Sequence, residues 1–443
     1  MALFDFLDSG DIRGKCETNF FHIVINDELP SVNFSNYTPE VKGTYVHEYC
    51  HYIQFVSTIF GIQYGFVYNT YFSKCREYIE ANASISIPIN ILGDNQLLES
   101  QIKKLKSLKG ATINLDIEIQ RIVLDEREVA AAKENDTGVL IKAFGKNDEE
   151  RSFQFGYLCI VESMANLLQS FFDEIEGQHP SIPYNAVKIV CQSVYPEIAE
   201  DRRLLISICL SSLHYNNPGA GFFEVIHILK DNPDFDGNDL YKHFCETSSV
   251  SYVGKKINIK DLLIQFIDKY KTNIQAAIQN ELEYFSKVFE NVKMEAELSQ
   301  HRLLYCLYND EMSLDAKVHY LLDFYGIPFI EASNQYIMPR RPEEDIPYND
   351  IAYLKGLEII INRFAPKMTT SSPPYDPICD NYERCLATQY DEKVLDKDRA
   401  PMTKDCKNKQ WNKEEICFMT TALRKFKLWG KEIDQPHLPM NMR

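Results

Sequence analysis

Residues 47–51 read His-Glu-Tyr-Cys-His, a spacing of residue types that can bind a metal ion and use it for hydrolysis. Side chains four positions apart lie on one face of a helix, so His47 and His51 can bind the same ion through their imidazoles. Glu48 lies beside that face, where its carboxylate can act as general base on a metal-activated water and pass the proton to a leaving group. These ligand types favour Zn²⁺.

The residues before the motif predict a helix that holds both histidines. Thr38 can cap its first turn, and Pro39 suits that turn because its missing N–H is not needed there. We expect the helix to run from about 39 to Gly61, where the glycine ends it. A strand is expected before it, at residues 19–26, which are β-branched and aromatic.

The segment from Thr44 to Gln54 resembles the active-site helix of the zincin superfamily of metallopeptidases. The resemblance implies a zinc-dependent peptidase in which a preceding edge strand aligns the peptide substrate. Gln54 and Ser57 stand where the metzincin subtype has glycine and a third histidine, so that subtype is excluded. The gluzincin arrangement remains, in which a glutamate from a later helix completes the site and leaves one position open for water.

Glu162 is the best candidate for that glutamate. It lies in a strongly apolar helix predicted over 156–172, where a carboxylate is costly unless it is paired or metal-bound. Ala165 would allow the two helices to approach closely, and Asn166 is expected to hydrogen-bond the far ring nitrogen of a ligand histidine. The segment looks like the Glu-x-x-Ala and Glu-x-x-x-Asp helices of gluzincins, with asparagine replacing the aspartate. It follows His51 by 111 residues, a long separation that implies an insertion.

Other residues compete for these roles. Glu77 and Glu80 follow His51 by 26 and 29 residues on a helix predicted over 63–82, and they could instead belong to a solvated helix face. Gln54, one turn after His51, could orient a ligand or the substrate, or be an ordinary buried amide.

Peptide hydrolysis also needs a donor for the developing oxyanion. In gluzincins this is a tyrosine or histidine downstream of the glutamate ligand. The resemblance therefore implies His214 or Tyr215 as candidates, although both could equally be core or loop residues.

The chain as a whole predicts an α+β fold that is mostly α-helical. We expect a zincin-like catalytic region at 1–235, made of a small sheet and the motif helix, with a β-containing insertion at about 85–150. A helical region at 236–335 and a loop-rich, cysteine-containing region at 336–443 would follow.

Hydrophobic periodicity gives the expected elements of these regions. Strands are expected at 112–119, 139–144 and 152–155, and helices over most of 186–325. Apolar residues recur every three or four positions over 259–289, which predicts a long core helix rather than a coiled coil that binds a partner.

Composition limits the partners. The 443 residues include 47 Lys and Arg against 64 Asp and Glu, for a net charge of −17, which argues against nucleic-acid binding. No apolar run is long enough for a membrane span, and the N-terminus lacks the pattern of a secretory signal. We therefore expect a cytoplasmic protein whose twelve cysteines are reduced.

The last four cysteines raise one alternative. Cys379, Cys385, Cys406 and Cys417 could hold a structural zinc ion, but they lack a Cys-x-x-Cys pair, so free buried thiols are the default expectation.

These observations favour a zinc metallopeptidase, an endopeptidase acting on a protein or peptide substrate with Glu48 as general base. Two alternatives stay open. One is a metal-dependent hydrolase of a non-peptide substrate, because the motif specifies a metal and a base but no amide bond. The other is a non-catalytic helical interaction protein with a vestigial metal site. Neither the oligomeric state nor the cleavage preference follows from the sequence.

Overall fold

The structure is a computed structural model of the chain. It describes residues 13–364, apart from 32, 87, 88, 90, 111–118, 174–179, 334 and 341–350. Nearer the C-terminus it describes residues 406, 410–414 and 417–434. In this part of the chain the fold is α+β and mostly helical, with four small sheets.

The largest sheet joins the N-terminal residues to residues more than 300 positions later. Its strand order is β1-β2-β9-β10, and the strands are Gly14–Glu17, His22–Ile25, Phe329–Ala332 and Tyr336–Ile337. β1 pairs antiparallel with β2, and β2 pairs parallel with β9. The strand expected at 19–26 is thus shorter, because Thr18–Phe20 form a 3-10 helix and Phe21 is left-handed at φ 50°. β1 itself was not predicted.

The motif helix is α1 (Pro39–Ser57), and the next helix is α2 (Ile59–Ala81). The predicted end at Gly61 is wrong. The break lies at Thr58, whose backbone is extended and whose Oγ1 caps α2 by accepting a hydrogen bond from the N–H of Gly61. Glycine is needed there for a different reason, because a Cβ would lie 2.5 Å from the carbonyl oxygen of Phe55.

The segment predicted as an insertion carries its own sheet. The expected strands 139–144 and 152–155 are confirmed as β5 and β6, whereas the strand expected at 112–119 lies almost entirely outside the described residues. The elements of this segment are β3 (Ser84–Ser86), α3 (Gln96–Lys109), β4 (Arg121–Val123), α4 (Glu126–Asn135), β5 (Val139–Phe144) and β6 (Glu150–Phe155). β4, β5 and β6 form a three-stranded antiparallel sheet.

The helix expected at 156–172 is α5 (Tyr157–Gln169), which directly follows β6. Helices dominate the next part of the chain, as predicted: α6 (Ser181–Tyr184), α7 (Ala186–Val194), α8 (Arg202–Ser212), α9 (Pro218–Asp231) and α10 (Gly237–Thr247). A hairpin of β7 (Ser249–Tyr252) and β8 (Lys255–Asn258), which was not expected, interrupts them.

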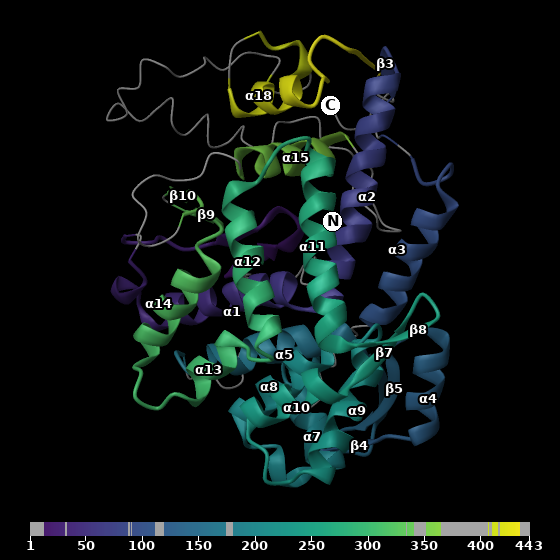
Figure 1. The fold of residues 1–443 in the computed structure, drawn as a ribbon, viewed down its shortest axis with the longest axis vertical. Coiled ribbons are helices and arrows are strands. Elements are labelled where there is room, and N and C mark those ends of the chain that lie inside the picture. The colour runs from purple at the N-terminus through teal and green to yellow at the C-terminus, as the bar shows by residue number, and fades with distance from the viewer. Residues whose placement is uncertain are drawn as a thin grey trace.

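The long helix expected over 259–289 is two helices. α11 (Ile259–Ile278) ends where Gln279 turns left-handed at φ 51°, and α12 (Glu283–Glu297) begins four residues later. Figure 1 shows the two side by side, so the apolar spacing that continues through the turn packs one against the other. The remaining elements are α13 (Arg302–Tyr308), α14 (Leu314–Tyr325), α15 (Ile351–Phe364), α18 (Phe418–Lys425) and β11 (Glu432–Asp434).

A buried polar group ties α15 to the large sheet. His22 of β2 lies 3.2 Å from a carboxylate oxygen of Glu331 on β9 and 3.1 Å from one of Glu358 on α15. Lys355 approaches Glu358 to 2.9 Å. Burial opposes a charge on His22, but the two carboxylates outweigh it and raise the pKa of the imidazole. The group therefore balances two cations against two anions inside the fold.

Candidate metal centre

The motif residues of helix α1 are buried inside the protein. Oγ1 of Thr38 accepts a hydrogen bond from the N–H of Val41, and Pro39 stands in the first turn, as the sequence predicted. His47 is 7% exposed, Glu48 6% and His51 8%. Polar side chains this buried need partners, so their neighbours decide what they can do.

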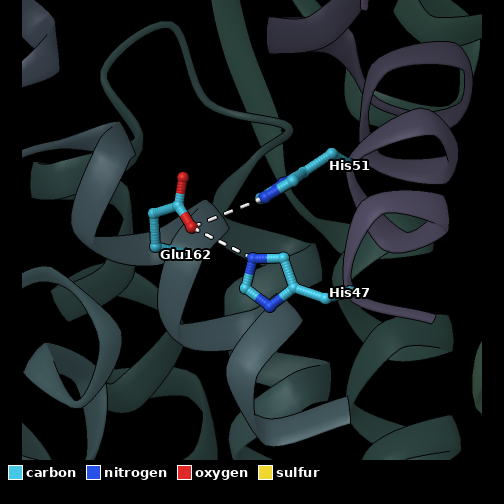
Figure 2. A group of neighbouring side chains, drawn as sticks. All are labelled: His47, His51 and Glu162. Carbon is cyan, nitrogen blue, oxygen red and sulfur yellow. Dashed lines mark hydrogen bonds and ion pairs between the residues drawn. The ribbon is translucent and has the colours of Figure 1, made fainter. Parts of the chain in front are cut away.

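Glu162 of α5 lies between the two histidines (Figure 2). Its Oε2 atom is 3.3 Å from Nε2 of His47 and 3.5 Å from Nε2 of His51. Ligand atoms bound tetrahedrally at the usual zinc distances lie about 3.4 Å apart. The three donor atoms, all within 4.8 Å of one another, therefore fit the spacing of a His₂Glu metal site. It is the only such group of His, Cys, Asp or Glu side chains among the described residues.

Charge couples these three groups strongly. Burial alone would lower the pKa of His51, but the Glu162 carboxylate more than offsets it and raises that pKa to about 9. Burial alone would raise the pKa of Glu162, but His51 and His47 hold it well below its usual range. Glu162 is therefore an anion at neutral pH, which is the state in which it could bind a cation.

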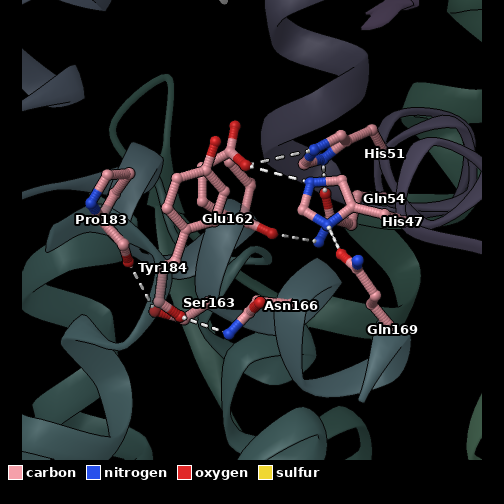
Figure 3. Close-up of polar contacts among 10 residues, drawn as sticks. His47, His51, Gln54, Glu162, Ser163, Asn166, Gln169, Pro183 and Tyr184 are labelled. Carbon is pink, nitrogen blue, oxygen red and sulfur yellow. Dashed lines mark hydrogen bonds and ion pairs between the residues drawn. The ribbon is translucent and has the colours of Figure 1, made fainter. Parts of the chain in front are cut away.

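A glutamine amide faces the other ring nitrogen of each histidine (Figure 3). Oε1 of Gln169 lies 3.0 Å from Nδ1 of His47, and Oε1 of Gln54 lies 2.9 Å from Nδ1 of His51. Nε2 of Gln54 donates to the carbonyl oxygen of Val161, 3.1 Å away, so its amide oxygen must face the histidine. In a neutral imidazole, an oxygen acceptor keeps the proton on Nδ1, and this is the tautomer in which Nε2 can bind a metal ion.

The sequence reasoning included Gln54 but missed Gln169. Asn166, the residue expected to orient a ligand histidine, has other partners: its Nδ2 lies 3.4 Å from both the carbonyl oxygen of Tyr184 and Oδ1 of Asn185. Gln169 follows Glu162 by seven residues, two helical turns, so helical periodicity alone could have indicated it.

Close packing of α1 on α5 allows Gln169 to reach His47. Gly43 lies one turn before His47, and a Cβ there would stand 2.8 Å from Cβ of Asp173 and 3.3 Å from Cγ of Gln169. Ala165, expected to permit this approach, is fully buried. Gly43 thus lies where α1 closely approaches the residues at the end of α5.

Tyr184 is a second residue that the sequence reasoning missed. Its ring centroid lies 6.1 Å from that of His47, and Figure 3 shows it beside Glu162. Burial, followed by the charges of Glu162 and Glu48, raises the pKa of its hydroxyl, so the group stays protonated and can donate a hydrogen bond. Nothing in its spacing distinguishes it from the other 25 tyrosines of the chain.

The two residues expected to stabilise an oxyanion have different surroundings. Nδ1 of His214 lies 3.5 Å from the N–H of Ile59, and its Nε2 lies 3.2 Å from the hydroxyl of Tyr241. Burial lowers the pKa of His214 to about 3, so it is a neutral core residue. Tyr215 packs against Phe244 and against Gly221. Neither contact brings these two residues to the group around Glu162.

The alternative third ligands lie on the surface side of α2. Glu77 is 2.6 Å from Nζ of Lys74 and its side chain is 55% exposed. Glu80 is 3.0 Å from Nζ of Lys427. Both are ion-paired residues on the helix face, which agrees with the solvated-face alternative given in the sequence analysis.

Two of the late cysteines can be placed. Sγ of Cys406 accepts a hydrogen bond from Nζ of Lys413, 3.3 Å away, and Cys417 caps α18 through its sulfur. Cys379 and Cys385 lie outside the described residues.

Comparisons with known proteins add no relative to this picture. No family model, curated protein or solved structure matches the chain. Among the described helices, none combines the length and the apolar character that a membrane span requires.

Proposed function

We propose that this chain is a zinc-dependent metallopeptidase. His47, His51 and Glu162 would hold the ion, and Glu48 would serve as general base. The observation that carries the proposal is the position of Glu162, whose Oε2 approaches Nε2 of both motif histidines from another helix. When bound, Zn²⁺ would supply a Lewis acid that polarises a carbonyl and makes a water nucleophilic at neutral pH.

Glu48 has the properties that its role requires. It is buried beside His47, and this burial raises its pKa, although the nearby histidines oppose the rise. A carboxylate that resists ionisation accepts a proton more readily than an exposed one. It would take the proton at its carboxylate and deliver it to the amine that leaves.

Tyr184 would stabilise the negative charge that develops on the substrate carbonyl oxygen. Its protonated hydroxyl faces the same space as Glu162, and the amide of Asn166 holds its backbone. A buried donor aimed at this charge contributes more than it would in water.

The zincin resemblance also implies an edge strand beside the motif helix. β1, an edge strand antiparallel to β2, packs beside α1. We propose it, in place of the expected strand 19–26, as the strand that aligns an extended peptide substrate. The elements from α2 to β6 account for the long separation between His51 and Glu162.

We also propose a cytoplasmic location. The ten cysteines of the described residues are all free thiols, which suits a reducing compartment.

One observation favours a second candidate function. The Glu162 side chain is only 12% exposed and the histidine side chains 9%, so access to the site is narrow. A metal-dependent hydrolase of a small non-peptide substrate is therefore the alternative.

Substrate profiling separates the two. We expect the zinc-loaded protein to cleave members of a proteome-derived peptide library, with Glu48→Gln inactive but still zinc-bound. A zinc-loaded protein that cleaves no peptide would contradict the peptidase proposal and favour the alternative.

A further inference from the structure

The main chain of β1 lies directly against the side chain of Glu48. A Cβ built at Gly14, the first residue of β1, would stand 2.8 Å from both Cγ and Oε1 of Glu48. It would also stand 2.9 Å from Cγ2 of Thr44, one turn earlier on α1. Real Cβ atoms do not approach other atoms this closely, so only glycine fits between the strand and the helix without a shift.

The next residue on this face of β1 also lies near the candidate metal site. Cys16 is two residues after Gly14, so the two lie on one face of the strand. The Cys16 side chain is buried, and its pKa is raised by burial and then by Glu48, Glu17, Cys50 and Glu162. This face therefore covers the general base and looks toward the metal ligands.

No polar contact holds the Glu48 carboxylate among the described residues. The metal ligands differ, because Glu162 contacts both histidines and each histidine contacts a glutamine. Among the described residues, Glu48 is therefore positioned by packing, and the backbone of Gly14 lies close enough that a Cβ there would stand 2.8 Å from its side chain.

We propose that Gly14 is a positioning residue for Glu48. The absence of its side chain lets β1 press on the carboxylate and hold it where it can receive a proton. Any larger residue displaces either the base or the strand. This inference rests on the proposed function, because a base needs a reaction to serve.

Gly14→Ala tests the proposal, with Gly93→Ala as matched control because a Cβ at Gly93 meets nothing within 4 Å. We expect Gly14→Ala to bind one Co²⁺ per chain with the visible spectrum of the wild-type protein. On a peptide selected from the library, we expect kcat to fall about 10- to 100-fold, the cost of moving a reacting group by about 1 Å, at nearly constant KM. Gly93→Ala should match the wild type in Co²⁺ content, visible spectrum, kcat and KM.

Adding Thr44→Ser provides a rescue. Serine lacks the methyl group 2.9 Å from the new Cβ and keeps the hydroxyl that donates to the carbonyl oxygen of Glu40. We expect Gly14→Ala with Thr44→Ser to recover part of the lost kcat.

The outcomes separate two failures. Wild-type kcat in Gly14→Ala beside an inactive Glu48→Gln would overturn the role of Gly14 and leave the proposed function standing. Full activity in Glu48→Gln, or a wild type that cleaves no peptide, would overturn both. If Gly14→Ala loses Co²⁺, or if neither it nor the double variant folds, the glycine supports the structure rather than the base.

Discussion

Oε1 of Gln169 lies 3.0 Å from Nδ1 of His47, a residue 122 positions earlier in the chain. A neutral amide thus faces the ring nitrogen of this histidine that points away from Glu162. The contact links the end of α5 to the middle of α1. The same helix α5 carries Glu162 two turns earlier, on the same face as Gln169. The orientation of one candidate ligand therefore depends on the helix that supplies another.

Removing that amide should weaken metal binding. We expect Gln169→Ala to lower the affinity for Zn²⁺ by about 10- to 100-fold, because the imidazole loses the partner that holds its tautomer and orientation. Competition with a chromogenic chelator measures this affinity. Gln169→Glu, which restores an oxygen acceptor, should bind at least as tightly as the wild type. Equal affinities in all three proteins would show that the contact has no effect on the site.

Zinc binding should also be sensitive to substitution of Gly43, which permits this contact. In Gly43→Ala the new methyl group would press on Cβ of Asp173, 2.8 Å away, and push the end of α5 from α1. We expect a lower thermal midpoint of unfolding and about tenfold weaker Zn²⁺ binding, since Gln169 then loses its contact with His47. Gly93→Ala serves again as control. An unchanged midpoint together with unchanged affinity would contradict the packing described for these helices.

Tyr184→Phe should separate catalysis from metal binding. The variant keeps the ring that packs near His47 and loses only the hydroxyl, so zinc content should match the wild type. We expect kcat on a library-selected peptide to fall about 10²- to 10³-fold, as when one oxyanion donor is removed. Tyr215→Phe is the matched control and should keep its activity. Loss of activity in Tyr215→Phe but not in Tyr184→Phe would restore the original sequence prediction.

His214 should make the fold sensitive to acid. Burial lowers its pKa from the ordinary 6.5 to about 3 in the folded protein, so between these two values the unfolded chain binds a proton that the folded chain does not. Stability should fall as the pH drops from 6.5 toward 3, by about 1 kcal/mol per pH unit for this group. The thermal midpoint followed against pH should drop less steeply in His214→Gln. Identical slopes would show that His214 is not the group that titrates.

The parts of the site that follow from local spacing were predicted from the sequence. The four-residue interval of the histidines, the Thr38 cap and the apolar run around Glu162 are each contained in one helix, and helical geometry relates such residues directly. Whether these residues bind a metal stays a prediction.

The rest depends on contacts between distant segments. β1 is four residues long, Gly-Lys-Cys-Glu, and has no apolar alternation to indicate a strand; it is ordered by pairing with β2. Tyr184 reaches Glu162 only through the folded path of the chain after α5. The break at Gln279 was hidden for the opposite reason, because the apolar spacing continues through it and packs α11 on α12.

The central claim is that three residues from two helices hold one metal ion. Its most direct test is the zinc content of the purified protein by mass spectrometry, compared with His47→Ala, Glu162→Ala and the control Glu77→Ala. We predict about one zinc per chain in the wild type and in Glu77→Ala, and none in the other two variants. A wild type without zinc, or zinc retained in Glu162→Ala, would contradict the account.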